Sequence, residues 1–158
     1  MIIKFPVFKY EIIRNNMDIH VRELMKKQVV SIDGSLTVKD AAKMMEDSKV
    51  SCLIVMENSI PTGILTERDF VTRVTSAGKP SSTSVRKVMS SPLISIGPDE
   101  NVKKLAEMIK DKDIHKIPVV EDNRLIGIVS ATDLVRKCIV ESDLDMRQIC
   151  NSFAQMAF

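Results

Sequence analysis

Residues 117–133 read IPVVEDNRLIGIVSATD, and residues 53–69 read LIVMENSIPTGILTERD. Each stretch has two apolar runs around a short polar turn, a glycine in the second run, and an aspartate that ends the pattern. Apolar runs separated by such a turn are typical of a β-hairpin. A Ser or Thr followed three residues later by an acid is typical of a helix start. The chain is therefore predicted to form the same hairpin and helix start twice.

The similarity extends well beyond the hairpins. Residues 21–72 and 85–136 align at an offset of 64 without a gap, and 16 of the 52 pairs are identical. A duplicated structural unit is the economical explanation. Two copies of one small unit are expected to pack with pseudo-two-fold symmetry, which would place paired clefts where small ligands bind.

Each copy has the same order of predicted elements. A Met-centred helical turn (VRELM, VRKVM) precedes a short β-rich run, VVSI at 29–32 and LISI at 93–96. An amphipathic helix follows, for which Thr37 and Asn101 are suitable N-caps. The apolar positions of these two helices are Val38, Ala41, Ala42 and Met45 in copy one, and Val102, Leu105, Ala106 and Ile109 in copy two. With the hairpin and a second helix, from about 67 to 75 and from about 131 to 141, the unit is β-α-β-β-α.

These signals divide the chain into five segments and predict an α+β fold. The segments are an N-terminal arm (1–18), repeat one (19–76), a linker (77–84), repeat two (85–140) and a C-terminal helical tail (141–158). The tail has an apolar stripe, which is expected either to cover exposed core or to form a dimer contact.

Composition excludes several classes of protein. Charge is nearly balanced, with 23 Lys+Arg against 21 Asp+Glu, and aromatic residues make up only 4% of the chain, which argues against a nucleic-acid partner. The basic arm, with Lys4, Lys9 and Arg14, is too small to change this. Three scattered cysteines and two distant histidines predict free thiols and no metal site. Without a long apolar run or a signal-peptide core, we expect a cytoplasmic protein with no membrane segment.

The paired stretches resemble the cystathionine β-synthase (CBS) domain. The resemblance rests on the hairpin and helix start in both copies, Ile117-Pro118-Val119-Val120 to Asp133 and Leu53-Ile54-Val55-Met56 to Asp69, and covers roughly residues 19–140. Copy one departs from the pattern at Ile54, where the family commonly has proline. The resemblance implies a tandem CBS pair, or Bateman module, of the kind that binds AMP, ADP, ATP or S-adenosylmethionine and regulates another protein.

The resemblance also implies two unequal pockets, each combining the aspartate of one copy with a loop and strand entrance of the other. The first predicted pocket contains Thr66, Arg68, Asp69, Arg86, Ile94, Ile114, His115 and Lys116. The second contains Ser130, Thr132, Asp133, Lys26, Val30, Val50, Ser51 and Cys52. Branched apolar residues would hold a purine, the aspartates would bind ribose hydroxyls, and the cations would bind phosphate. The first pocket has more donors and is predicted to bind the nucleotide more tightly.

Each of these residues also has a purely structural interpretation. The Thr66–Asp69 and Ser130–Asp133 pairs form a capping box whether or not a ligand binds. His115 could be a surface residue beside a strand, Arg68 and Lys116 could be solvated charges, and Cys52 could be a small buried side chain.

Two functional hypotheses follow from the sequence. The first is a regulatory module that binds an adenosine compound, forms a homodimer through its amphipathic helices and acts on a separate protein. The second is an interaction scaffold of the same fold without a ligand. An enzyme is not predicted, because the sequence has no phosphate-binding G-x-x-x-x-G-K-[ST] loop, no H-E-x-x-H and no G-x-S-x-G motif.

Overall fold

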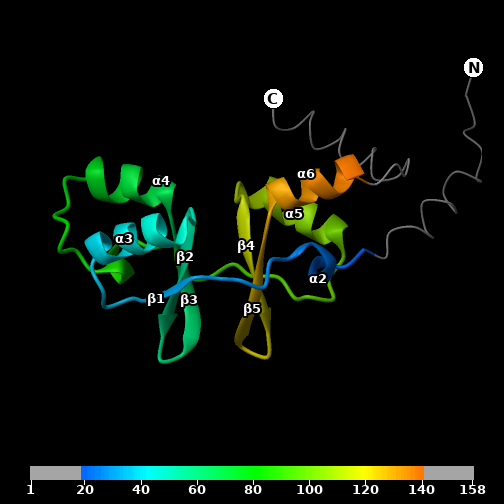
Figure 1. Cartoon of the computed structure of the whole chain (residues 1–158), viewed down its shortest axis with the longest axis horizontal. Coiled ribbons are helices and arrows are strands. Elements are labelled where there is room, and N and C mark those ends of the chain that lie inside the picture. The colour runs from blue at the N-terminus through cyan, green and yellow to red at the C-terminus, as the bar shows by residue number, and fades with distance from the viewer. Residues whose placement is uncertain (1–18, 141–158) are drawn as a thin grey trace, which may run out of the picture. The chain divides into compact units, whose positions relative to one another are not determined.

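The computed structural model of the chain describes residues 19–140, and the predictions for the arm and the tail lie outside this range (Figure 1). Its helices and strands confirm the α+β prediction. Those that begin in repeat one are α2 (Val21–Leu24), β1 (Ser31–Asp33), α3 (Val38–Ser48), β2 (Cys52–Glu57), β3 (Ile60–Thr66), α4 (Glu67–Asp69) and the π-helix η1 (Phe70–Thr75). Those of repeat two are the 3-10 turn η2 (Val85–Lys87), α5 (Val102–Lys112), β4 (Lys116–Glu121), β5 (Arg124–Ser130) and α6 (Ala131–Val140).

The described residues form two compact units, each treated separately below. One unit contains residues 26–95 and 120–128, and the other contains residues 19–25, 96–119 and 129–140. These units do not coincide with the repeats. The helical turn α2, which begins repeat one in the chain, packs with repeat two: Val21 N donates to Glu100 O at 2.8 Å. At the equivalent place in the other unit, Val85 N of η2 donates to Leu36 O at 2.8 Å.

Strands β1, β2 and β3 form one sheet, in which β1 is parallel to β2 and β2 is antiparallel to β3. Strands β4 and β5 form a second, two-stranded sheet. The strand predicted at 93–96 is reduced to a single parallel bridge between Ile96 and Val119. A proline interrupts the ladder on each side of this bridge. In repeat one Ile54 N donates to Val30 O at 3.0 Å, whereas the equivalent residue of repeat two, Pro118, has no N–H. Gly34 N continues the repeat-one ladder by donating to Met56 O at 3.2 Å, whereas the equivalent residue, Pro98, has no N–H.

Both predicted helix caps are present. Thr37 Oγ1 accepts from Asp40 N at 3.2 Å, and Asn101 Oδ1 accepts from Lys104 N at 3.0 Å. In α3 the cap is reciprocal, because Asp40 Oδ2 accepts from Thr37 N at 3.0 Å and from its hydroxyl. Two hydrogen bonds to its carboxylate hold the pKa of Asp40 below its ordinary value. The bond from the Thr37 hydroxyl has the larger effect, and the bond from the Thr37 N–H adds to it.

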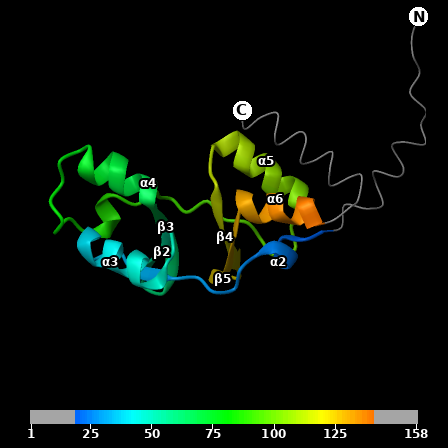
Figure 2. The ribbon, with the colours of Figure 1, turned by 45° about the horizontal axis from the view of Figure 1, so that its top comes forward.

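Helix α3 covers the sheet of its unit, and both views place α3 and α4 on the same side of β2 and β3 (Figure 1, Figure 2). Its buried residues are Val38, Ala41 and Met45. Ala42 is exposed, so its predicted place on the apolar face is wrong. The apolar face of α3 continues past Ala41 to the half-buried Met44. Ala42 lies beyond the other edge of this face and is therefore exposed.

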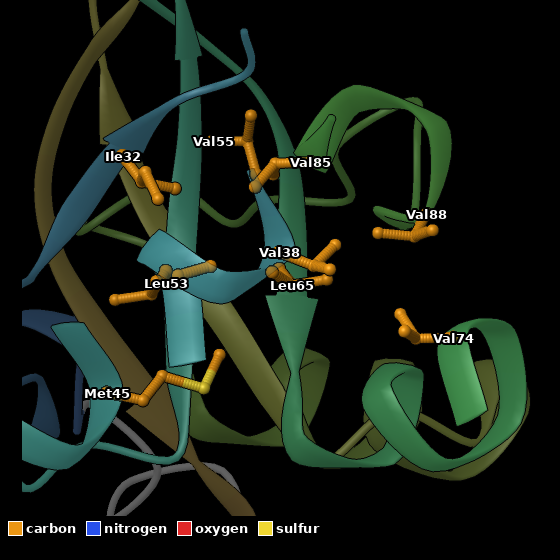
Figure 3. Packing of buried hydrophobic residues seen from close by; sticks show 10 residues of the cluster. Ile32, Val38, Met45, Leu53, Val55, Leu65, Val74, Val85 and Val88 are labelled. Carbon is orange, nitrogen blue, oxygen red and sulfur yellow. The ribbon is translucent and has the colours of Figure 1, made fainter. Parts of the chain in front are cut away.

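The buried face of α3 joins a core that the unit builds from residues between 30 and 89. Ile32, Val38, Leu53, Val55, Leu65 and Val85 are all at most 3% exposed (Figure 3). Val74 of η1 and Val88, which follows η2, close one edge of the same cluster. The segment 85–89 therefore belongs to the core of the unit that contains repeat one.

Candidate functional site

The aspartate at the second helix of repeat one is held in place by the residue that starts that helix. Asp69 Oδ2 accepts a hydrogen bond from Thr66 N and another from Thr66 Oγ1, both at 2.8 Å. Asp69 is 6% exposed and is the buried charged residue of the described range. A charge is rarely buried without partners, so this carboxylate is fixed in orientation.

Repeat two builds the same arrangement. Asp133 Oδ2 accepts from Ser130 N at 3.0 Å and from Ser130 Oγ at 2.5 Å. Ser130 Oγ in turn accepts from Asp133 N at 3.3 Å. The capping interpretation is confirmed for both repeats, and ribose binding by these carboxylates stays a prediction.

In each unit the loop that enters the hairpin lies against the start of the second helix. Ser51 O accepts from Glu67 N at 3.3 Å, and His115 O accepts from Ala131 N at 3.0 Å. Each loop thus adjoins the helix start of its own repeat. From the sequence, the hairpin-entry loop and the helix start of one repeat were expected in different pockets. The combination of the aspartate of one copy with the loop of the other copy stays a prediction.

A pocket of about 520 Å³ opens beside this junction in repeat one. Its lining residues are Ala42, Met45, Glu46, Lys49, Val50, Ser51, Glu67 and Phe70. Val50 and Ser51 were predicted as site residues, whereas Glu46, Lys49, Glu67 and Phe70 were missed. The volume falls in the range of pockets that hold small ligands.

Lys49 reaches this position because it ends α3 in a left-handed conformation, with φ of 53°. A glycine would normally mark such a helix end. Lysine gives no such signal in the sequence.

The predicted cations are on the surface of their units. Arg86 forms an ion pair with Glu57, with Nε 3.4 Å from Oε1, and its side chain is 51% exposed. Arg68 and Lys26 are exposed, and Lys116 is half-buried. Lys26 is fixed through its main chain, which exchanges two hydrogen bonds with Ile128 at 2.8 and 2.9 Å.

The remaining predicted residues differ in exposure. Thr132, His115 and Ile94 are exposed, whereas Val30, Val50, Ser51, Cys52, Thr66, Ile114 and Ser130 are half-buried. Cys52 lies at the start of β2, where it pairs with Thr66 across the hairpin. The structure thus brings Cys52 and Thr66 together, although the sequence assigned them to different pockets.

Arg73 is a further residue that sequence reasoning missed. Its Nε lies 3.3 Å from Asp69 Oδ1, and its Nη1 donates to the carbonyl oxygens of Val88 and Met89 at 3.1 and 2.7 Å. An acid and an arginine four residues apart on a helix can pair, and this spacing could have identified the contact with Asp69. The two carbonyl contacts depend on tertiary structure and have no sequence signal.

No three His, Cys, Asp or Glu side chains of residues 19–140 lie together in a way that could hold a metal ion. None of the helices there has the length and apolar composition needed to cross a membrane.

Comparison with known proteins identifies the family. The sequence model of the CBS domain matches residues 21–76 and again residues 85–139, so the chain belongs to the CBS domain family and carries a tandem pair. It is 32% identical over 114 residues to the CBS domain-containing protein YhcV of Bacillus subtilis, a match that covers 72% of this chain and 81% of that protein.

Solved structures show the same fold. The hexameric CBS-CP12 protein from bloom-forming cyanobacteria matches with a TM-score of 0.69 and 34% identity, over 75% of this chain and 70% of that one. The CBS domain pair of protein MJ0100, solved with 5′-methylthioadenosine and S-adenosyl-L-methionine, also has a TM-score of 0.69, over 75% of this chain and 98% of that one. At 23% identity, the second match is evidence for the fold alone.

Proposed function

We propose that this chain is a regulatory module that binds an adenosine compound, namely AMP, ADP, ATP or S-adenosylmethionine, and acts on a separate protein without being an enzyme. The observation that carries the proposal is the pair of aspartates, Asp69 and Asp133, each fixed by a hydroxyl residue at the start of a helix in a CBS repeat. The MJ0100 pair, which has the same fold, was solved with ligands of this adenosyl class.

The chemistry of the aspartates suits a ribose. An ionised carboxylate has about four lone-pair positions for hydrogen bonds. Thr66 uses two of them on Oδ2 of Asp69, and the other oxygen faces Arg73. A fixed carboxylate with remaining acceptor capacity is well suited to a pair of neighbouring hydroxyl groups. The other ligand-contacting residues that we propose are those predicted from the sequence.

The proposed state of association is a homodimer formed through the helices. Val71 and Val135 occupy equivalent positions in the second helices of the two repeats and are 65% and 41% exposed. The dimer contacts expected from the sequence were Ala42, Met45, Ala106 and Ile109. Met45 and Ile109 are buried in their own units and are not accessible to a partner, whereas Ala42 is exposed and Ala106 is half-buried. Sedimentation of the wild type against a Val71→Asp, Val135→Asp variant tests this, and an unchanged dimer in the variant would contradict it.

Thermal melting with each of the four adenosine compounds tests the proposed ligand. At about 100 times the dissociation constant, a ligand that binds only the folded chain should stabilise it by roughly 2.7 kcal/mol. Asp69→Ala should reduce this shift more than Asp133→Ala, because the first predicted pocket has more donors. Asp40→Ala is the matched control, since Asp40 caps α3 in the same way and has no proposed ligand role.

The outcome distinguishes the two hypotheses. The control should lose stability and keep the full ligand shift. No shift of the wild type with any of the four compounds would favour the ligand-free scaffold.

A further inference from the structure

The guanidinium group of Arg73 contacts two parts of one unit that lie far apart in the sequence, the helix start at Asp69 and the segment 85–90. On one side it lies against Asp69 Oδ1 at 3.3 Å, and on the other it donates to Val88 O and Met89 O. The planar fork of an arginine can bridge a carboxylate and carbonyl groups at once, which a single ammonium group cannot do with the same geometry. Arg73 is therefore the direct link between Asp69 and the segment 85–90.

That segment has other polar contacts as well. Arg86 N donates to Gly34 O at 3.0 Å, the Arg86 side chain pairs with Glu57, and Lys79 Nζ donates to Lys87 O at 3.4 Å. Ser90 and Ile64 exchange two main-chain hydrogen bonds at 2.8 and 3.0 Å, and Val85 N donates to Leu36 O at 2.8 Å. Between these two ends, the carbonyl groups of Val88 and Met89 accept from Arg73. A change in the position of Arg73 thus alters the hydrogen bonding of the middle of the segment.

A change in the position of Arg73 also alters the contacts of the Asp69 carboxylate. Both hydrogen bonds from Thr66 go to Oδ2, so Oδ1 is the oxygen with capacity for a new donor, and it is also the oxygen that faces Arg73. A hydroxyl group that binds Oδ1 shares or displaces the guanidinium. Binding at this carboxylate and the packing of segment 85–90 are linked through one side chain.

We propose that Arg73 is a positioning residue that transmits the state of the Asp69 carboxylate to segment 85–90, and so couples ligand binding in repeat one to the first residues of repeat two. The regulatory part of this inference rests on the proposed function. The coupling itself does not, because it is a property of the ligand-free chain.

Repeat two offers a natural comparison. The residue equivalent to Arg73 is Lys137, and the residues equivalent to Val88 and Met89 are Leu24 and Met25. A substitution at Lys137 therefore alters the equivalent cation without touching the Arg73 bridge.

The test is amide hydrogen exchange of the full chain, resolved by residue, in a double-mutant cycle of Asp69→Asn and Arg73→Gln. Asp69→Asn removes the charge that holds the guanidinium, and we expect it to speed exchange at Met89 and Ser90 by about tenfold, as for loss of local protection. In the Arg73→Gln background the same substitution should have little further effect, because coupled positions are not additive. Arg73→Lys should behave like Arg73→Gln, and Lys137→Gln should leave these amides unchanged.

The amide of Ala41, bonded to Thr37 O within α3, reports whether the unit as a whole has opened. Additive effects of Asp69→Asn and Arg73→Gln at Ser90, with Ala41 still protected, would overturn the proposal. AMP and S-adenosylmethionine are then added to the wild type. If one of them shifts the melting temperature and leaves exchange at Met89 and Ser90 unchanged, the inference fails and the proposed function stands. If neither shifts melting, the proposed function fails, and the mutant cycle alone decides the coupling.

Discussion

At the scale of single residues, Gly63 explains why the second strand of the hairpin carries a glycine. A β-carbon at this position would lie 2.5 Å from Met89 Sδ and 2.9 Å from Ser90 O. The methionine could move aside, but the carbonyl belongs to the main-chain bridge between Ile64 and Ser90. The glycine is needed because another part of the backbone approaches the strand closely.

Gly63→Ala is therefore expected to destabilise the chain. Overpacking of this kind typically costs about 1–3 kcal/mol, and urea denaturation of the wild type and the variant measures it. Gly97→Ala is the control, since its β-carbon would meet Glu100 Cγ at an ordinary 3.5 Å. Equal losses from the two substitutions would contradict the close-approach argument.

At the scale of elements, both hairpins turn through two residues in the left-handed region. Asn58 and Ser59 have φ of 49° and 64°, and Asp122 and Asn123 have φ of 49° and 62°. Two positive φ angles in a two-residue loop are typical of the type I′ turn, whose twist matches that of the strands. Asparagine and aspartate tolerate this conformation, whereas serine seldom adopts it.

Ser59→Gly should therefore stabilise the chain. The left-handed conformation costs an ordinary residue roughly 1–2 kcal/mol, and the added freedom of glycine in the unfolded chain cancels about 0.4–1 kcal/mol of the relief. We expect a net gain of about 0.5–1 kcal/mol by chemical denaturation. The equivalent Asn123→Gly should gain less, and a larger gain there would refute this explanation.

At the scale of the whole molecule, the repeat, the hairpins and the helix caps could be predicted because each is encoded locally. The turn residues, the N-caps and the alternation of apolar runs lie within a few positions of the structure that they specify. The family resemblance then supplied the fold. Three features could not be predicted: the contacts of Arg73 with the carbonyl groups of Val88 and Met89, the pocket residues Lys49 and Phe70, and the packing of each Met-centred turn. All three depend on contacts between segments distant in sequence, which local patterns do not record.

The placement of the Met-centred turns leads to a prediction about the molecule as a whole. Val21 and Val85 are both fully buried, but Val21 packs in the unit of repeat two and Val85 in the unit of repeat one. Truncating either to alanine removes apolar contacts and leaves a cavity, at a cost of about 2 kcal/mol. Each turn packs in the unit of the repeat to which it does not belong in sequence. Each substitution is therefore expected to destabilise the other repeat.

Amide hydrogen exchange can locate that damage. Val85→Ala should weaken protection in α3 and leave α5 close to wild type, whereas Val21→Ala should weaken α5 and spare α3. The informative amides are those of Ala41 and Leu105, which bond to Thr37 O and Asn101 O in the first turns of these helices. Each variant serves as the control for the other, since the residue type, its burial and the substitution are the same. If Val85→Ala loosened α5 and Val21→Ala loosened α3, each turn would belong to its own repeat, contrary to the hydrogen bonds that join Val21 to Glu100 and Val85 to Leu36.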